Sequence, residues 1–529
     1  MFSTLFLRCT DWNPQFFREV KGRLKPRWVA AIAATSLLFQ ALVGLYFWVI
    51  LPDTDATYNR YCTKITPDYY SMRSCMLDAT GAVKVDWALW WLHLFQFLSW
   101  SLPAVLLLAG VYMLIGDIAK EEKRGTLNFI RLSPQTSRRV LLGKLLGVPV
   151  LPMLLVLLAL PLHGVAAVQA GIAWTSLLSV YLITILVCGF LYTGAMFYAF
   201  LGSGQGWLGA IVVSLGYSFV YPLWSVGRSH TPPSYLHLGS WFHLRVGNEL
   251  GLFVGLAAVT LAIGTLWNWL AANRRFRNPN RVVLSRLQSY GMTLSFTVLL
   301  FGFAFRDYPD WGSRHALSDG AGLLVANLFW QLLLIAALTP SRQTLLDWAR
   351  YRHEGRMQHG RREWRRALFQ DLVFGDSSPA LVAIVINLLI PMVLWTPWIL
   401  SWGESPAGLG LVNVVFNALF LLVCALLTQM ILFSKAQKRE VVAFAINLLV
   451  LAVPPVVLLM LGGAPENGAF NIFWLFSGFS FAALDTLELM SIAFGAIAYL
   501  TSITLLLGNH TRQLRKAGAS EFKRLSAAV

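Results

Sequence analysis

Long apolar segments recur along the whole chain between short basic segments, and this alternation constrains the fold more than any other feature. Each segment has about the 20 residues that a helix needs to cross the hydrocarbon core of a bilayer. Hydrophobic residues make up 57% of the 529 residues and charged residues only 13%, which is more apolar surface than a water-soluble core can bury. The segments lack the apolar–polar alternation of barrel strands. The sequence therefore predicts an all-α, polytopic bundle of transmembrane helices.

The apolar segments predict about twelve crossings. A further apolar stretch, Phe470–Leu484, is short and broken by Gly478, and it would put the basic C-terminal tail outside if it crossed. We expect it to be re-entrant or interfacial at the outer face. The predicted spans lie at residues 28–51, 88–116, 140–162, 174–200, 205–226, 248–272, 289–305, 318–339, 379–402, 409–433, 441–463 and 486–508.

The lysines and arginines indicate how these spans are oriented. Segments such as Lys21–Arg27, Lys120–Arg139 and Arg342–Arg366 fall on one side when the spans are counted in order, and the positive-inside rule makes that side cytosolic. This bias, with contact to anionic lipid headgroups, accounts for the formal charge of +17, so no nucleic-acid partner is expected. We expect a protein of the inner (plasma) membrane with both termini cytosolic and no cleavable signal peptide.

The chain divides into five predicted parts. Residues 1–27 form an amphipathic cytosolic segment, and residues 28–272 form a six-span unit with a cytosolic segment at 117–139. Residues 273–378 form a connecting region with two spans, residues 379–508 a second, degenerate unit, and residues 509–529 a basic cytosolic tail. The segment Asn13–Glu19 before the first span resembles Ala367–Asp371 before the ninth, which indicates an internal repeat of the kind that transporters use. A chance likeness between two basic-then-apolar segments is the alternative.

The cytosolic segment after the second span carries the most informative motif. It reads Glu-Glu-Lys-Arg-Gly-Thr-Leu at residues 121–127, then Ser133-Pro134, then Gly143-Lys144. Leu127, Ile130 and Phe129 are expected on one face of a short helix that is otherwise polar. Gly125 permits a sharp turn before this helix, and Ser133-Pro134 ends it. A solvated basic loop is the alternative interpretation.

This order of features resembles the coupling-helix segment of ABC-2-type transporter permeases, the membrane subunits of ABC exporters. The likeness is good over residues 13–272 and weaker over 365–529, where Lys435–Glu440 lacks Gly-Thr-Leu and Ser-Pro. The resemblance implies contact with a separate ABC ATPase subunit through the coupling residues Glu121, Glu122, Arg124, Gly125, Thr126, Leu127, Ser133 and Pro134.

The same resemblance implies export of a lipid, a glycan or a hydrophobic compound. The chain contains no Gly-x-x-x-x-Gly-Lys-Ser/Thr phosphate loop, so we expect a transport permease rather than an enzyme, with no cofactor of its own. Membrane lipids are further expected partners, and one or two copies of the chain per transporter are both open. The competing hypothesis is a non-ABC integral membrane protein, such as a lipid-processing enzyme or a membrane assembly factor.

Polar residues elsewhere give weaker signals. The loop Arg228–Arg245 holds three histidines without metal-ligand spacing, so solvated side chains are favoured there over a metal site. His93 is expected to be a packing residue. Asp117 lies near a span end, which disfavours ion coupling. The buried amides are expected to form hydrogen bonds between helices rather than to line a path; they are Asn327, Asn387, Asn413, Asn417 and Gln429.

Two of the five cysteines share one loop. Cys62 and Cys75 lie in the polar segment Pro52–Trp87, which the charge bias places outside, where an oxidising compartment favours disulfides. We predict a Cys62–Cys75 disulfide, with two unpaired thiols as the alternative. No pair of cysteines has the spacing of metal ligands, so no metal site is expected.

Overall fold

The computed structural model describes residues 12–52, 60–63, 83–202, 206–207, 209, 211, 213, 240–279, 281–305, 313–358, 361–402, 404–434, 439–461, 471–482 and 488–526. In this part of the chain all extended structure is limited to isolated β-bridges, such as Cys62 with Val85, and the rest of the regular structure is helical. The predicted all-α, polytopic fold is confirmed. Eleven of the described helices are long and apolar enough to cross a membrane.

The outward faces of these helices are apolar. Only 11% of the apolar window of α3 (Pro26–Val49) and 6% of that of α10 (Leu250–Arg277) is buried inside the protein. Leu37, Leu42 and Trp48 of α3 are among the exposed large side chains. Lipid is the solvent in which such surfaces are stable, and helices satisfy all their backbone hydrogen bonds there. The structure thus supports a multi-pass membrane protein.

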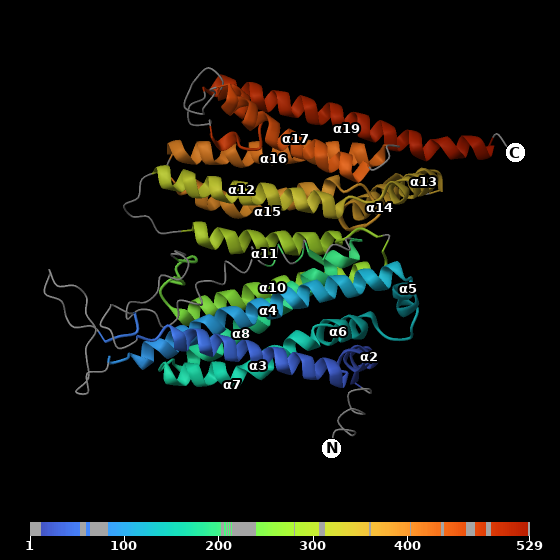
Figure 1. Cartoon of the computed structure of the whole chain (residues 1–529). Coiled ribbons are helices and arrows are strands. Elements are labelled where there is room, and N and C mark those ends of the chain that lie inside the picture. The colour runs from blue at the N-terminus through green and yellow to red at the C-terminus, as the bar shows by residue number, and fades with distance from the viewer. Residues whose placement is uncertain are drawn as a thin grey trace. The chain divides into compact units, whose positions relative to one another are not determined.

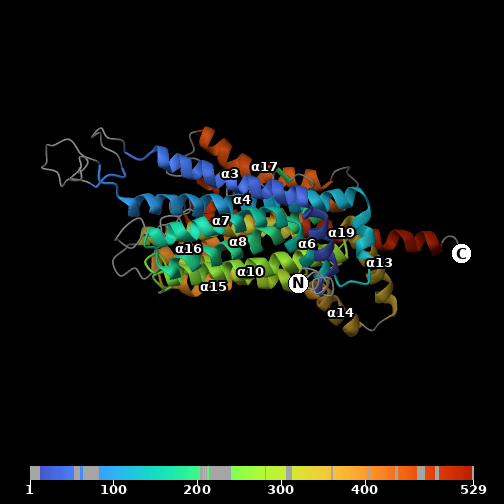
Figure 2. The same ribbon diagram turned by 60° about the horizontal axis from the view of Figure 1, so that its bottom comes forward.

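One compact unit comprises Met1–Gly239 and Arg245–Arg277, and we call it unit 1. Its long helices run side by side along a common direction, as Figure 1 and, from a second side, Figure 2 show. The short helices α2, α5 and α6 lie at one end of them. The helices of unit 1 are α2 (Pro14–Arg23), α3, α4 (Trp87–Lys123), α5 (Thr126–Arg131), α6 (Ser137–Gly147), α7 (Val150–Gln169), α8 (Trp174–Phe200) and α10.

The other compact unit, unit 2, comprises Ser240–Leu244 and Asn278–Val529. Helix α16 is its centre, because α12, α15, α17 and α19 all pack against it. The basic helices α13 and α14 lie at one end of the unit (Figure 1). Its helices are α11 (Arg286–Ala304), α12 (Ser313–Leu338), α13 (Arg342–Gln358), α14 (Arg361–Phe374), α15 (Leu381–Leu400), α16 (Glu404–Phe433), α17 (Arg439–Met460), α18 (Asn471–Trp474), η3 (Ser480–Ala482) and α19 (Leu489–Ser526).

The observed helix ends correct the predicted spans in two places. The third span was predicted at 140–162, but the helix breaks at Val148 and Pro149, and the apolar candidate span is Val150–Gln169. Pro149 lacks the backbone N–H that a continuous helix would use. Helix α4 runs to Lys123, beyond the predicted end at residue 116, so the predicted cytosolic segment 117–139 begins as helix.

Two further predictions concern parts of the chain that are only partly described. The predicted fifth span, 205–226, lies outside the described residues except for isolated positions. Within Phe470–Leu484, the described residues 471–482 form only α18 and the single turn η3. Neither is long enough to cross a membrane, as the sequence predicted for this stretch. The two spans predicted for the connecting region, α11 and α12, pack against α15 and α16 within unit 2.

Candidate functional site

Helix α5 lies at the end of α4 and contains the centre of the predicted coupling motif. Gly125 separates the two helices with φ of 72°, a left-handed conformation that favours glycine. The hydroxyl of Thr126 donates to the carbonyl of Glu121, 3.2 Å away, which closes the turn. The helix ends at Arg131, just before Ser133-Pro134. The sequence thus predicted the turn, the short helix and its end.

The two faces of α5 differ from the prediction in one residue. Leu127 and Ile130 are buried, as expected, but Phe129 is 79% exposed and the next apolar residue, Leu132, is 86% exposed. Both lie beyond the apolar candidate spans of α4 and α7. Phe129 was expected on the buried face; it lies elsewhere because a helix repeats every 3.6 residues, so Leu127 and Ile130 share a side that Phe129 does not. Two large apolar side chains therefore protrude next to basic residues.

A cation–π contact joins α5 to the end of α10. The guanidinium of Arg131 lies 5.6 Å from the centre of the Phe276 ring. Next to it, the hydroxyl of Ser137 at the start of α6 donates to Oδ1 of Asn273 at 2.7 Å and accepts from Nε of Arg277 at 2.7 Å. The short helices α5 and α6 are thus both fastened to α10. Of the remaining predicted coupling residues, Glu122, Arg124 and Pro134 are exposed.

Helix α2 packs against α6 through its polar face. Asn13 caps α2 by accepting hydrogen bonds from the backbone N–H of Gln15 and of Phe16, and its amide donates to the carbonyl of Arg139 at 2.8 Å. Gln15 and Glu19 are buried, whereas Phe16 and Phe17 are half-buried. An amphipathic helix on the cytosolic surface was expected. Its buried side is polar because side chains of opposite charge on α4 and α6 pair with it.

Two glycines let α2 and α6 approach closely. A Cβ atom on Gly143 would lie 2.7 Å from the backbone nitrogen of Phe16, and one on Gly147 would lie 2.6 Å from Cβ of Glu19. Real Cβ atoms do not approach so closely, and small residues four apart form a flat helix face. The Gly143-Lys144 pair of the sequence motif therefore belongs to the contact with α2.

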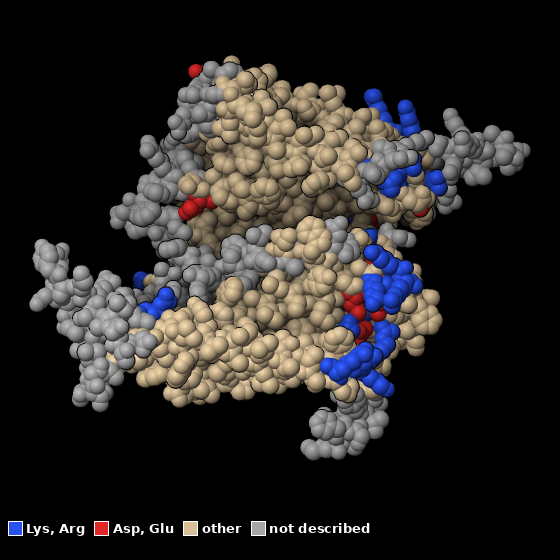
Figure 3. Space-filling view, viewed as in Figure 1, with Lys and Arg blue, Asp and Glu red and all other residues tan. Residues whose placement is uncertain are grey.

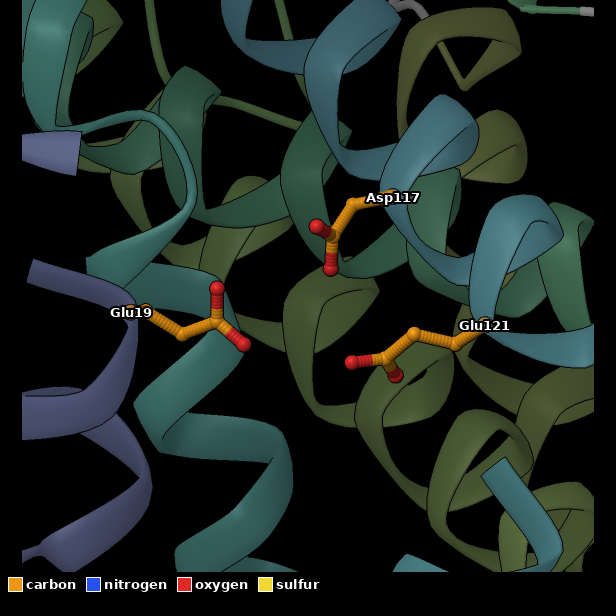
Figure 4. A group of neighbouring side chains, drawn as sticks. All are labelled: Glu19, Asp117 and Glu121. Carbon is orange, nitrogen blue, oxygen red and sulfur yellow. The ribbon is translucent and has the colours of Figure 1, made fainter. Parts of the chain in front are cut away.

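Lys144 lies at the centre of three carboxylates. Its side chain is fully buried, and its Nζ lies 2.7 Å from Oδ2 of Asp117, 2.8 Å from Oε2 of Glu121 and 3.3 Å from Oε1 of Glu19. Figure 4 shows these carboxylates turned toward a common point, Glu19 from α2 and the other two from the end of α4. We call these four residues the Lys144 cluster. It joins α2, α4 and α6.

Two arginines of α2 complete the charge balance. Arg23 lies 3.0 Å from Oε2 of Glu19 and 2.6 Å from Oδ1 of Asp117, and Arg18 lies 3.0 Å from Oε1 of Glu121. Three carboxylates thus face three cations. Figure 3 shows acidic and basic side chains gathered together at this end of unit 1. Buried charges persist in proteins when they are paired and hydrogen-bonded in this way.

The three carboxylates also lie close enough together to hold a metal ion. The ammonium of Lys144, however, occupies the point on which their oxygens converge. Burial lowers the pKa of Lys144, but attraction to Asp117, Glu19 and Glu121 outweighs it, and the net direction is upward from the ordinary 10.5. The lysine therefore stays charged at neutral pH. The cluster is an ion-pair network rather than a cation site.

The sequence motif contains Glu121 and the Gly143-Lys144 pair, but the cluster itself was not predicted. Asp117 was noted only as a span-end charge, and Glu19 only as part of the segment before the first span. One signal could have found the cluster: Lys144 is a charge among apolar residues, and Asp117 and Glu121 share one face of α4 at a spacing of four. A buried lysine requires such a partner.

Unit 2 fastens its own amphipathic helix with a different buried cation. Arg286, at the start of α11, donates to the carbonyls of Leu372 at 3.3 Å, Gly375 at 2.6 Å and Ser378 at 2.5 Å. These carbonyls lie at the end of α14 and in the turn that leads to α15. The guanidinium thus caps the C-terminal end of α14, where the helix dipole is negative. The segment Lys435–Glu440, predicted to be a second coupling segment, lies largely outside the described residues.

Histidines in the described residues contribute to packing. His163, which was not singled out in the sequence, is buried in α7. Its ring lies 2.8 Å from Oγ of Ser99 and 2.9 Å from the hydroxyl of Tyr181, so it joins α4, α7 and α8. His93 lies 3.2 Å from the hydroxyl of Tyr61. In the loop Arg228–Arg245, His243 packs against the ring of Phe305, and the other two histidines lie outside the described residues.

Cys62 is disulfide-bonded. Its predicted partner, Cys75, lies outside the described residues, so the pairing stays a prediction. Cys188 and Cys424 are buried free thiols. Comparison of the chain with family models, with curated proteins and with solved structures finds no match.

Proposed function

We propose that this protein is the membrane-spanning permease of an ABC-type transporter, driven by a separate cytosolic ATPase subunit. The observation that carries the proposal is the protruding apolar pair on α5. Phe129 and Leu132 are exposed outside the apolar candidate spans, beside the charged residues of the turn. Apolar side chains that are exposed outside the candidate spans favour a protein partner. The motif order around α5 resembles that of an ABC-2-type coupling helix.

The packing around α5 supports a mechanical role. Helix α4 continues from the apolar core of unit 1 into the turn at Gly125 without a break, so a force on α5 acts directly on a membrane-spanning helix. The Lys144 cluster ties the end of α4 to α2 and α6. Movement of α5 by an ATPase would therefore displace a rigid group of helices together, which is what switching between two states requires. We propose export of a lipid, glycan or hydrophobic compound.

Co-purification tests the proposal against a lipid-processing enzyme or an assembly factor. The full-length protein, tagged and extracted from its native membrane, is expected to bring down an ATPase that carries a phosphate loop. The double variant Phe129→Asp, Leu132→Asp is expected to lose that ATPase while it still inserts. The matched control is Asn128→Asp, because Asn128 is an exposed residue of the same helix. Absence of any ATPase with the wild-type protein would refute the proposal.

A further inference from the structure

A small cavity lies inside unit 2, between α12, α15 and α16. Trp395 and Trp398 of α15, Trp402 in the turn that follows, and Asn413 of α16 line it. The lining residues come from the first half of α12, from the end of α15 and the turn after it, and from the first half of α16. Trp395 and Trp398 are three residues apart and so share one face of α15, and Trp402 follows in the turn after the helix. The cavity has a volume of about 10 Å³, room for about one water-sized group.

Close packing fixes one wall of the cavity. A Cβ atom on Gly320 would lie 2.8 Å from Cη2 of Trp402, and one on Gly410 would lie 2.8 Å from Cζ3 of the same ring. Both glycines also line the cavity. The indole of Trp402 is therefore wedged between α12 and α16 and has little freedom to turn its nitrogen toward another partner.

Three residues that line this cavity each carry a buried polar atom without a hydrogen-bond partner. These atoms are the indole nitrogens of Trp395 and Trp402, which are donors, and Oδ1 of Asn413, which is an acceptor. Trp395 is 2% exposed and Asn413 6% exposed. A buried polar group without a partner is destabilising, and most of all within the apolar part of a membrane protein. Three such atoms at one cavity point to a group that the cavity binds.

Other polar atoms of unit 2, such as those of Gln429, are also buried without a partner, but Gln429 does not line this cavity. Amides close to Asn413 in the bundle are paired. Asn417, one turn along α16 from Asn413, accepts a hydrogen bond of 3.1 Å from Asn327 of α12. Asn387 of α15 accepts one of 2.6 Å from Thr293 and donates one of 3.0 Å to Ser289, both on α11. Asn327, Asn387 and Asn417 thus hold helices together, as the sequence predicted. The same prediction is not met by Gln429, whose amide nitrogen and oxygen are both buried without a partner, nor by the amide oxygen of Asn413. Asn413 leaves its carbonyl free at the cavity.

We propose that this cavity is a binding site for a hydroxyl oxygen. A hydroxyl has two lone pairs, which accept the N–H groups of Trp395 and Trp402, and a hydrogen, which it donates to Oδ1 of Asn413. A carboxylate or an ester oxygen would accept the two N–H groups but leave Asn413 without a donor. A cation would face two donors. Water and the hydroxyl of a membrane-soluble alcohol, such as a lipid with a free hydroxyl group, share the required chemistry.

Three probes with the same octyl chain test separately whether the two N–H donors and the acceptor of Asn413 contribute to binding. The full-length protein in lipid nanodiscs is heated with 1-octanol, with octyl methyl ether or with octane, and its melting temperature is followed against probe concentration. 1-Octanol can satisfy all three atoms, the ether only the two donors, and octane none. We expect a saturable rise in melting temperature that is largest for 1-octanol and smallest for octane, since only ligands bound by the folded state raise it.

Variants test whether the preference for 1-octanol arises at this cavity. Trp395→Phe keeps an aromatic ring and removes the N–H, and Asn413→Leu keeps the approximate volume and removes the acceptor. Either is expected to abolish the preference of 1-octanol over the ether or octane. The matched control is Trp398→Phe, because Trp398 lines the same cavity but its nitrogen is not among the buried atoms without a partner. It should keep the preference.

A high-resolution cryo-electron microscopy map of the protein without added alcohol shows whether the bound hydroxyl belongs to water or to an alcohol. Density for a single atom between the three polar atoms, with no preference for 1-octanol, would identify water as the hydroxyl. A preference for 1-octanol would identify the hydroxyl of a membrane-soluble alcohol. The proposal would be overturned if the map shows no such density and 1-octanol is not preferred. It would also be overturned if Trp398→Phe removes the preference for 1-octanol as completely as Trp395→Phe does.

Discussion

The ammonium nitrogen of Lys144 lies 2.7 Å from Oδ2 of Asp117, although the two residues belong to separate helices, α6 and α4. Glu121 of α4 and Glu19 of α2 approach the same nitrogen. A single buried cation thus fastens the helix that leads to the coupling turn, the helix before the first span and the helix before the third. The consequences of removing each part of this arrangement can be measured.

We expect Lys144→Met to be strongly destabilising. It leaves three carboxylates with two arginines, and removal of one partner from a buried ion pair costs about 3–5 kcal/mol. The pKa of Lys144 is raised in the folded state, so the stabilisation by its charge is complete below pH 10.5 and is lost only above it. The loss should therefore appear at neutral pH as a lower melting temperature. Lys120→Met, at an exposed position of α4, is the control, and equal melting temperatures for the two variants would contradict the prediction.

Gly143→Leu should detach α2 from α6. The new side chain would meet the backbone of Phe16, which has no room to withdraw while Asn13 stays bound to Arg139. Hydrogen–deuterium exchange should become faster in Pro14–Arg23 than in the wild-type protein. Gly116→Leu on α4 is the matched control, because nothing lies within 4 Å of a Cβ there. Unchanged exchange in α2 of Gly143→Leu would show that α6 tolerates a side chain at this contact.

Replacement of Gly125 by proline should uncouple transport from ATP hydrolysis, if the proposed function holds. Proline fixes φ near −65°, whereas Gly125 has φ of 72°, so the turn between α4 and α5 must rearrange. Asparagine tolerates left-handed φ, and Gly125→Asn should therefore keep coupling. Charge reversal at Glu122 together with Arg124 is expected to act like proline. The measurement is substrate-stimulated ATPase activity of the reconstituted complex. Normal stimulation of the proline variant would argue against the coupling assignment of α5.

We predict that Cys62 pairs with Cys75. Cys62 is disulfide-bonded, and Cys188 and Cys424 are free. Denatured, non-reduced protein should therefore yield a proteolytic peptide in which Cys62 is linked to Cys75, and this peptide should disappear on reduction. Cys188 and Cys424 should react with a thiol reagent before reduction and thus report complete denaturation. Reaction of both Cys62 and Cys75 without reduction would exclude the bridge.

The sequence by itself determined the all-α membrane fold, most of the helix positions and the turn at Gly125. Long apolar runs leave a helix as the stable way to cross lipid, and Gly-Thr-Leu followed by Ser-Pro is a local signal for a turn and a short helix. The third span was misplaced because the apolar run continues through Gly143, Lys144 and Gly147, whereas the helix breaks at Pro149.

Only the tertiary structure decided which charges meet. Glu19, Asp117 and Lys144 are far apart in the chain, so their spacing in the sequence does not show that they meet. Charge pairing between separate helices depends on how those helices pack, which in turn depends on Gly143 and Gly147. The unpaired atoms of Trp395, Trp402 and Asn413 were equally invisible in the sequence, since a missing hydrogen bond exists only between residues already placed in space.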